Sequence, residues 1–356
     1  MEKRYHSIRP GQIWLDTNGN RIQAHGGSLM ALGGRYYWYG ENKEFTDPAK
    51  GIWHWGVRCY RSDDLYNWED LGLIIPPDTE NPASSIHPSS MMDRPHILYN
   101  KKTKKFVCWL KIMERDGSQS ETVLTADSLT GPYTIVREHL SPLGMSAGDF
   151  DLVTAYDGKG YYYFERVHSE TICADLTDDY TDVTGYYSTH FPRPYPPYVR
   201  EATAHFLRGH KHYLITSGTT GYFPNPSEIA VADSWHGPYR VLGDPHPGDP
   251  SRTSFHSQVS SVFKVPGKKD LYIACADRWM PHAMDVPYSQ VEKAFAGSFD
   301  ADASPEEKAE AGRIMASLPP ANTRDADYVW LPFRFDGEMA ILDWHDEWRI
   351  EDYDGE

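Results

Sequence analysis

The feature that most constrains this chain is a hairpin pattern that recurs five times along its 356 residues. Each unit has a strand that opens on a polar residue, a turn rich in Gly, Lys or Asn, and an aromatic return strand. The return strands start near Tyr36, Phe106, Tyr161, Tyr213 and Tyr272, at intervals of 52 to 70 residues. This spacing suits blades of four antiparallel strands, so the sequence predicts an all-β fold, a five-bladed β-propeller.

The first strand of each blade lines the axis of a propeller, so the residues that open these strands are expected to meet. These residues are His25, Asp93, Asp149, Glu201 and Gln258. Three carboxyl groups, an amide and an imidazole in one place favour a binding or catalytic pocket over a structural core.

The last blade is interrupted at about residues 285–325. Ser304 is a predicted N-cap, Pro305 stands at the first helical position, and strong helix formers follow. We therefore predict a short helical insertion that covers the pocket rim. Apart from it, the repeat fills the chain, which predicts a single catalytic domain over residues 1–356.

Charge and composition exclude some partners. With 51 acidic and 35 basic residues the net charge is −16, which argues against nucleic acid and anionic membrane surfaces as partners. No apolar run approaches the ~18 residues of a membrane span. The segment Met1–His6 is not followed by the apolar stretch of a secretory signal, and the four cysteines lack CxxC spacing. Buried reduced thiols and a cytoplasmic location are the expectation.

Glu201 is the candidate general acid for cleavage of a glycosidic bond. Inverting hydrolysis needs a protonated carboxyl group at the leaving oxygen and a base ~6.5–9.5 Å away that activates water. Burial and the charge of Asp93 or Asp149 would raise the pKa of Glu201. The residue pattern leaves open the alternative that the adjacent Arg200 merely neutralises Glu201.

Seven ordered motifs between about residues 10 and 350 resemble glycoside hydrolase family 43, most of all its branch of exo-β-1,3-galactanases. They are Ile22–Gly27, Tyr36–Glu41, Arg94-Pro95 with Leu98–Asn100, Arg200–Ala202, Leu214–Gly218, Phe255–Gln258 and Tyr328–Pro332. The resemblance implies a five-bladed propeller and an inverting, exo-acting hydrolase. It further implies that the enzyme removes terminal galactose from plant or microbial galactan-type polysaccharides or oligosaccharides.

The same resemblance implies roles for single residues. It implies Glu201 as general acid and Gln258 in the base position, because this branch lacks the usual N-terminal Asp base and Gln23–His25 stand there. Asp149 is the alternative base, since a neutral amide has no basic lone pair. Sugar-binding positions of the branch match Glu41, Asp149 and Thr220, and further predicted substrate-binding residues are Asp93, Arg94 and His25.

Three departures from the branch keep other functions open: Asp93 where the branch has Glu, the polar loop predicted at 114–121, and the insertion. They leave a β-D-galactofuranosidase, an α-L-arabinofuranosidase or a non-catalytic sugar-binding propeller as alternatives. A phosphorolytic enzyme would need basic residues that converge on phosphate, for which the candidates are Arg94, Arg200 and Arg278.

No required cofactor or dedicated metal site is predicted. Family members often hold a calcium ion near the axis with one histidine, which raises the question for His25, His205 and His256. These residues show no oxygen-ligand spacing of a calcium site, so the sequence leaves a structural calcium ion open.

Overall fold

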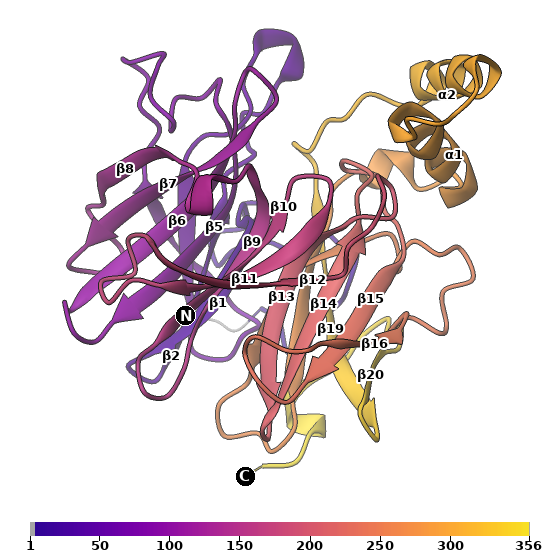
Figure 1. The fold of residues 1–356 in the computed structure, drawn as a ribbon. Coiled ribbons are helices and arrows are strands. Elements are labelled where there is room, and N and C mark those ends of the chain that lie inside the picture. Colours follow the sequence, from indigo (N-terminus) through magenta and orange to yellow (C-terminus); the bar gives the residue numbers. More distant parts are fainter. Residues whose placement is uncertain (1–3, 356) are drawn as a thin grey trace.

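Five four-stranded antiparallel sheets surround a common axis in the computed structural model of the chain, which describes residues 4–355 (Figure 1). The first strands of the blades contact one another in a closed ring, because β1 contacts β5, β5 contacts β9, β9 contacts β13, β13 contacts β17, and β17 returns to β1. The predicted five-bladed propeller is confirmed. Residues 1–3 and 356, which belong to the predicted domain and include the start of the Met1–His6 segment, lie outside the described residues.

The blades follow one another along the chain. Blade one consists of β1 (His25–Leu32), β2 (Arg35–Glu41), β3 (Val57–Ser62) and β4 (Glu69–Ile75). Blade two consists of β5 (Met91–Asn100), β6 (Lys105–Met113), β7 (Gln119–Ala126) and β8 (Thr134–Leu140). Blade three consists of β9 (Ala147–Thr154), β10 (Gly160–Arg166), β11 (Glu170–Leu176) and β12 (Val183–His190). Blade four consists of β13 (Arg200–Arg208), β14 (Lys211–Gly218), β15 (Ser227–Ala232) and β16 (Arg240–Gly243). Blade five consists of β17 (Gln258–Lys264), β18 (Tyr272–Arg278), β19 (Asp327–Asp336) and β20 (Met339–Leu342).

Aromatic side chains fill the space between blades one and five, where the ring closes. Trp38 and Trp330 pack with ring centroids 4.6 Å apart, and Trp68 contacts both rings in the same buried cluster. The two ends of the described chain also pair here, since Ile8 and Trp348 exchange both backbone hydrogen bonds, at 2.9 and 3.0 Å. Burial of these large rings stabilises the closure of the propeller.

Bulges near the opening end of the inner strands aim side chains toward the axis. The ladder between β5 and β6 shifts register between Asp93 and His96, and that between β13 and β14 shifts between Glu201 and Ala204. The residue after each opening residue, Arg94 or Ala202, has a positive φ of 53° or 51°. A bulge of this kind bends the strand and redirects its side chains, so Asp93 and Glu201 owe their direction to it.

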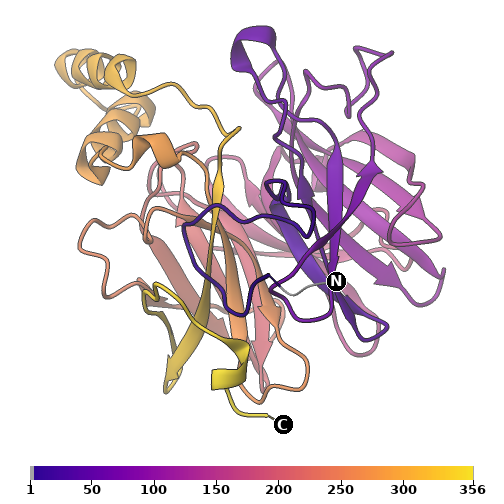
Figure 2. The same cartoon turned by 180° about the vertical axis from the view of Figure 1, so that it is seen from behind.

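The predicted insertion is present between β18 and β19 as a pair of helices, α1 (Tyr288–Phe299) and α2 (Pro305–Ser317). Ser304 caps α2 and forms a capping box with Glu307, as its sequence indicates. The two helices stand at one end of the propeller, away from the C-terminus (Figures 1 and 2). Short 3-10 turns occur in four places: η1 (Pro48–Lys50), η2 (Pro142–Gly144), η3 (Pro281–Ala283) and η4 (Ile350–Asp352).

Two further expectations can be compared with the structure. The loop predicted at 114–121 is shorter than expected, because Gln119 already begins β7 and pairs with Met113 across the hairpin. All four cysteines are buried and free, as predicted from their spacing. Within residues 4–355 no helix combines the length and the hydropathy needed to pass through a bilayer.

Candidate active site

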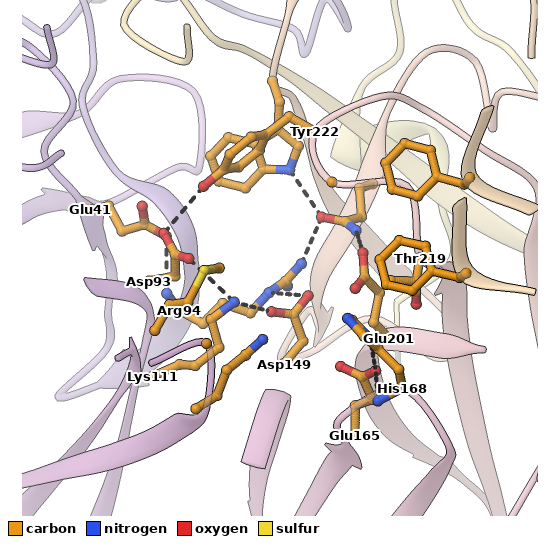
Figure 3. A pocket seen from close by; sticks show the side chains of 18 residues that line it. Glu41, Asp93, Arg94, Lys111, Asp149, Glu165, His168, Glu201, Thr219 and Tyr222 are labelled. Carbon is orange, nitrogen blue, oxygen red and sulfur yellow. Dashed lines mark hydrogen bonds and ion pairs between the residues drawn. The ribbon is translucent and has the colours of Figure 1, made fainter. Parts of the chain in front are cut away.

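A cavity of about 270 Å³ lies at the axis, at the end of the propeller where the inner strands open (Figure 3). Four of the five strand-opening residues line it, namely Asp93, Asp149, Glu201 and Gln258. The remaining polar and charged lining residues come from inner strand β5, from return strands, from the start of β7 and from turns: Arg94, Glu41, Lys111, Glu165, Gln119, His168, Thr219 and Tyr222. The repeat therefore brings the predicted residues of different blades together.

Two predicted substrate-binding residues lie behind the cavity wall, which corrects those predictions. His25 is completely buried, with Nδ1 3.0 Å from Asp277 Oδ1 and its ring stacked on Tyr328 at 4.7 Å. Thr220 is also fully buried, and its hydroxyl group donates to the carbonyl oxygen of Phe223 at 2.6 Å. Contacts with other interior residues thus engage both side chains. Thr219 lines the cavity in place of Thr220.

Asp149 is held as an ionised carboxylate by two basic side chains. Its Oδ2 lies 3.0 Å from Arg94 Nε, and its Oδ1 accepts a hydrogen bond from Lys111 Nζ at 2.7 Å. Burial opposes ionisation, yet the charges of Arg94 and Lys111 lower the pKa of Asp149 to about 2. Lys111 Nζ also lies 3.2 Å from Asp93 Oδ2, and although burial opposes ionisation, the charges of Lys111 and Lys43 lower the pKa of Asp93. Two acceptor carboxylates thus face the cavity.

Glu41 is a third carboxylate on this side of the cavity. Its Oε1 accepts a hydrogen bond from the backbone N–H of Arg94 at 2.9 Å, and its Oε2 lies 2.7 Å from Lys43 Nζ. Burial raises the pKa of Glu41 to about 7, against the opposing charge of Lys43. Glu41, Asp93 and Lys111 lie together at one side in Figure 3.

Glu201 lies across the cavity from that group, beside Glu165, His168 and Thr219 (Figure 3). Burial raises the pKa of Glu201 well above its ordinary value, and the charges of Asp149 and Glu165 add to the effect. The charges of Lys111 and Arg94 oppose it and do not overcome it. A carboxyl group in this environment retains its proton, as a general acid must.

Arg200, the residue next to Glu201, turns away from it. Its guanidinium donates to Thr216 Oγ1 at 3.0 Å and to the carbonyl oxygens of Thr216 and Pro226 at 2.9 and 3.1 Å. Its nearest carboxylate partner is Glu228, at 3.5 Å. The alternative in which Arg200 simply neutralises Glu201 therefore has no contact to support it.

Gln258 is held by hydrogen bonds on both ends of its amide. Its Oε1 accepts from Arg94 Nη2 at 2.7 Å and from Trp279 Nε1 at 3.0 Å, while its Nε2 donates to Ser217 Oγ at 2.9 Å and to Glu201 Oε1 at 3.4 Å. Guanidinium and indole N–H groups can only donate, which fixes the oxygen on their side. They also disfavour a proton on that oxygen, so the contacts support the ordinary amide form.

Several residues of the cavity were not among the predicted site residues, including Lys111, Glu165, His168, Tyr222 and Trp279. One signal could have found Lys111. It pairs with Asp93 in the ladder between β5 and β6, just as Ser217 stands opposite Glu201 and Glu41 opposite His25 in their ladders. The return-strand residue that pairs with each opening residue is therefore also a candidate for the cavity.

Of the three arginines proposed for a phosphorolytic alternative, Arg94 lines the cavity, whereas Arg200 and Arg278 do not. Arg94 is engaged by Asp149, Arg200 faces Glu228, and Arg278 donates to the carbonyl oxygens of Phe255 and His256. Among residues 4–355, no group of three or more His, Cys, Asp or Glu side chains is arranged to hold a metal ion. A structural calcium ion held by water and one histidine thus stays a prediction from the family resemblance.

The model of glycosyl hydrolases family 43 matches residues 23–282, which is most of the chain. The chain belongs to glycoside hydrolase family 43. This match confirms the predicted family and enzyme class. The substrate of the enzyme is therefore a carbohydrate. The family match ends before α1, so the helical insertion lies outside it.

Solved structures similar to this family-43 enzyme share its fold. A family-43 β-1,3-galactosidase superposes with a TM-score of 0.78 at 27% identity, covering 98% of this chain and 64% of that one. A second family-43 β-1,3-galactosidase, solved with galactodeoxynojirimycin, has a TM-score of 0.76 at 27% identity and covers 96% and 100% of the two chains. An exo-β-1,3-galactanase from Clostridium thermocellum has a TM-score of 0.75 at 26% identity and covers 96% and 66%. Among curated proteins, no sequence matches the enzyme significantly.

Proposed function

We propose that this family-43 enzyme is an inverting exo-glycosidase that removes terminal galactose from β-1,3-linked galactan-type chains. The observation that carries the proposal is the placement of Glu201, whose pKa is raised well above its ordinary value, in one small cavity with the carboxyl groups of Glu41, Asp93 and Asp149. The similar structures described as β-1,3-galactosidases and an exo-β-1,3-galactanase support galactose as the sugar. A volume of about 270 Å³ is just below the range of drug-sized ligand sites and suits one terminal sugar residue.

The two sides of the cavity have different roles, one in binding sugar hydroxyl groups and the other in proton donation. Asp93 and Asp149 accept hydrogen bonds from sugar hydroxyl groups, because ionised carboxylates form the stronger, charge-assisted kind. Lys111 and Arg94 keep these carboxylates ionised and in place. Glu201 gives its proton to the glycosidic oxygen as the bond to the leaving sugar breaks.

Gln258 contacts the attacking water in this proposal, and Asp149 acts chiefly on hydroxyl groups. Asp149 is poorly suited as base because both of its oxygens are ion-paired and its pKa is about 2. Gln258 has no charge, and Arg94 and Trp279 fix the direction of its amide. In this proposal its Nε2 exchanges the long 3.4 Å hydrogen bond to Glu201 for one to the attacking water. A positioned amide contributes by orienting water.

Hydrolysis of defined substrates tests the proposal. We expect cleavage of β-1,3-galactobiose and of an aryl β-galactopyranoside, with α-galactose as the first product in anomeric NMR. Aryl β-galactofuranosides and α-L-arabinofuranosides are the matched comparison substrates. Cleavage of a furanoside alone would replace galactopyranose by that sugar, and β-galactose as first product would refute inversion.

A further inference from the structure

Two phenylalanines of the insertion reach the cavity from outside the propeller repeat. Phe295 and Phe299 stand one turn apart on α1, both line the cavity, and their rings are nearly parallel with centroids 6.1 Å apart. Phe299 leaves 42% of its surface exposed. A pair of parallel rings open to a sugar site is an apolar surface with a specific shape, unlike a single exposed hydrophobic residue.

The helix that carries these rings is fixed against the cavity wall. Val291 and Ala294 of α1 are buried, and Val291 belongs to one cluster with Trp279, against which Phe295 packs. Helix α2 packs closely against α1 at Gly297, because a Cβ added to Gly297 would lie only 2.7 Å from Ala311 Cβ. The rings are therefore presented by a braced helix pair.

Contacts across the cavity mouth hold the end of α1 near the acid. Phe299 meets the His168 ring edge-on at 5.3 Å, and His168 Nδ1 lies 3.1 Å from Glu165 Oε1. Glu165 is close enough to Glu201 to raise its pKa. Asp300, which directly follows α1, accepts a hydrogen bond on Oδ2 from the Tyr195 hydroxyl group at 3.0 Å. The two rings thus stand on the Glu201 side of the cavity, opposite Glu41, Asp93 and Lys111.

The position of the acid decides which part of the substrate meets the rings. A general acid protonates the leaving oxygen, so the leaving sugar departs on its side of the cavity. The charged group opposite is suited to the hydroxyl groups of the terminal sugar, whereas two phenyl rings offer no hydrogen bonds. A pyranose ring has an apolar face of C–H groups that is complementary to such a surface.

We propose that Phe295 and Phe299 form the binding platform for the penultimate sugar, the pyranose on the leaving-group side of the scissile bond. This proposal rests on the glycosidase function proposed above and deepens it. The platform recognises the face of the ring and not its pattern of hydroxyl groups. It therefore makes the insertion the element that selects a disaccharide or longer chain over a substrate with a small leaving group.

Substrates with and without the second ring test the platform. The measured quantity is the ratio of kcat/KM for β-1,3-galactobiose to kcat/KM for β-galactosyl fluoride, which has no second sugar. Phe299→Ala and Phe295→Ala are each expected to lower this ratio about tenfold, mainly through KM for the disaccharide. Phe299→Trp keeps a ring and is expected to retain the ratio, whereas Phe299→Leu keeps an apolar residue without a ring and is expected to lower it.

Lys293→Ala is the matched control on the same helix. Lys293 is exposed and paired with Glu310 of α2 at 2.7 Å, outside the cavity, so its loss should leave the ratio unchanged. An unchanged ratio in both alanine variants, with melting temperatures like that of the unsubstituted enzyme, overturns the platform alone. Failure of the unsubstituted enzyme on both substrates overturns the glycosidase proposal and the platform with it.

Discussion

The two sides of the cavity differ in both origin and chemistry. The charged side is built by the propeller repeat, where the ladder pair of Asp93 and Lys111 places a carboxylate and an ammonium group next to each other. The apolar side contains Phe295 and Phe299 of a helix that interrupts the last blade and lies outside the family match. The repeat thus supplies the groups for chemistry and hydroxyl binding, and the insertion adds a surface for the rest of the substrate. Changes at Glu201 and Gln258 of the repeat should affect chiefly kcat, whereas changes at Phe295 and Phe299 should affect chiefly KM for longer substrates.

Glu201→Gln should give the largest effect. The side chain keeps its shape but loses the transferable proton, so kcat on β-1,3-galactobiose should fall by about 10³-fold or more while the sugar still binds. Steady-state kinetics and calorimetric binding of the substrate measure the two quantities. Glu44→Gln, an exposed change outside the cavity, is the control. Near-normal turnover of the Glu201 variant would remove Glu201 from the acid role.

Gln258→Ala should rank second, with a loss on the order of 10² in kcat, because the attacking water loses its positioning group. The expected effect on KM is smaller. Azide provides the contrary test, since it can replace a missing base and attack the sugar itself. Formation of a glycosyl azide by Asp149→Ala, with none by Gln258→Ala, would assign the base to Asp149.

Asp149→Asn should raise KM at least as much as it lowers kcat, because Asp149 acts on hydroxyl groups. It should also move the pH profile. Activity needs protonated Glu201, so it is lost as the pH rises through the pKa of Glu201, which lies well above the ordinary value. Burial is the largest cause of that shift, and the negative charge of Asp149 is the next. Removal of the Asp149 charge should therefore lower the pKa of Glu201 and move the alkaline limb of kcat/KM to lower pH. A limb that stays in place would show that the two carboxyl groups are not coupled.

Gly297→Ala should give the smallest effect, and it tests how firmly the apolar side depends on the helix pair. The added Cβ meets Ala311 Cβ at 2.7 Å and the carbonyl oxygen of Glu307 at 3.1 Å, so α1 and α2 must separate. Overpacking of this kind costs about 1–3 kcal/mol, which we expect as a lower melting temperature and a weaker preference for the disaccharide. Gly312→Ala is matched to it, because a Cβ there meets nothing within 4 Å. Equal behaviour of the two variants would contradict the bracing by α2.

Local sequence patterns were sufficient to predict the propeller and most of the residues that open its inner strands and line the cavity. Hairpins are local structures, so turn residues and aromatic return strands were enough to locate β1, β5, β9, β13 and β17. Once the strands are placed, the opening residues Asp93, Asp149, Glu201 and Gln258 must come together at the axis. The capped helix α2 could also be predicted, because its N-cap Ser304 and Pro305 at the first helical position are signals local to the sequence.

Only the tertiary structure decided which neighbouring side chain faces the cavity and what charge it carries. Thr219 and Thr220 are adjacent, and the contacts of Thr220 with Phe223 and Asn225 turn it into the interior. His25 opens a strand like the other four residues, yet Asp277 of another blade holds it in the core. The pKa of Glu201 and the approach of Phe299 likewise depend on groups distant in sequence. Desolvation, charge and ring packing act through space, so a repeat pattern along the chain does not contain them.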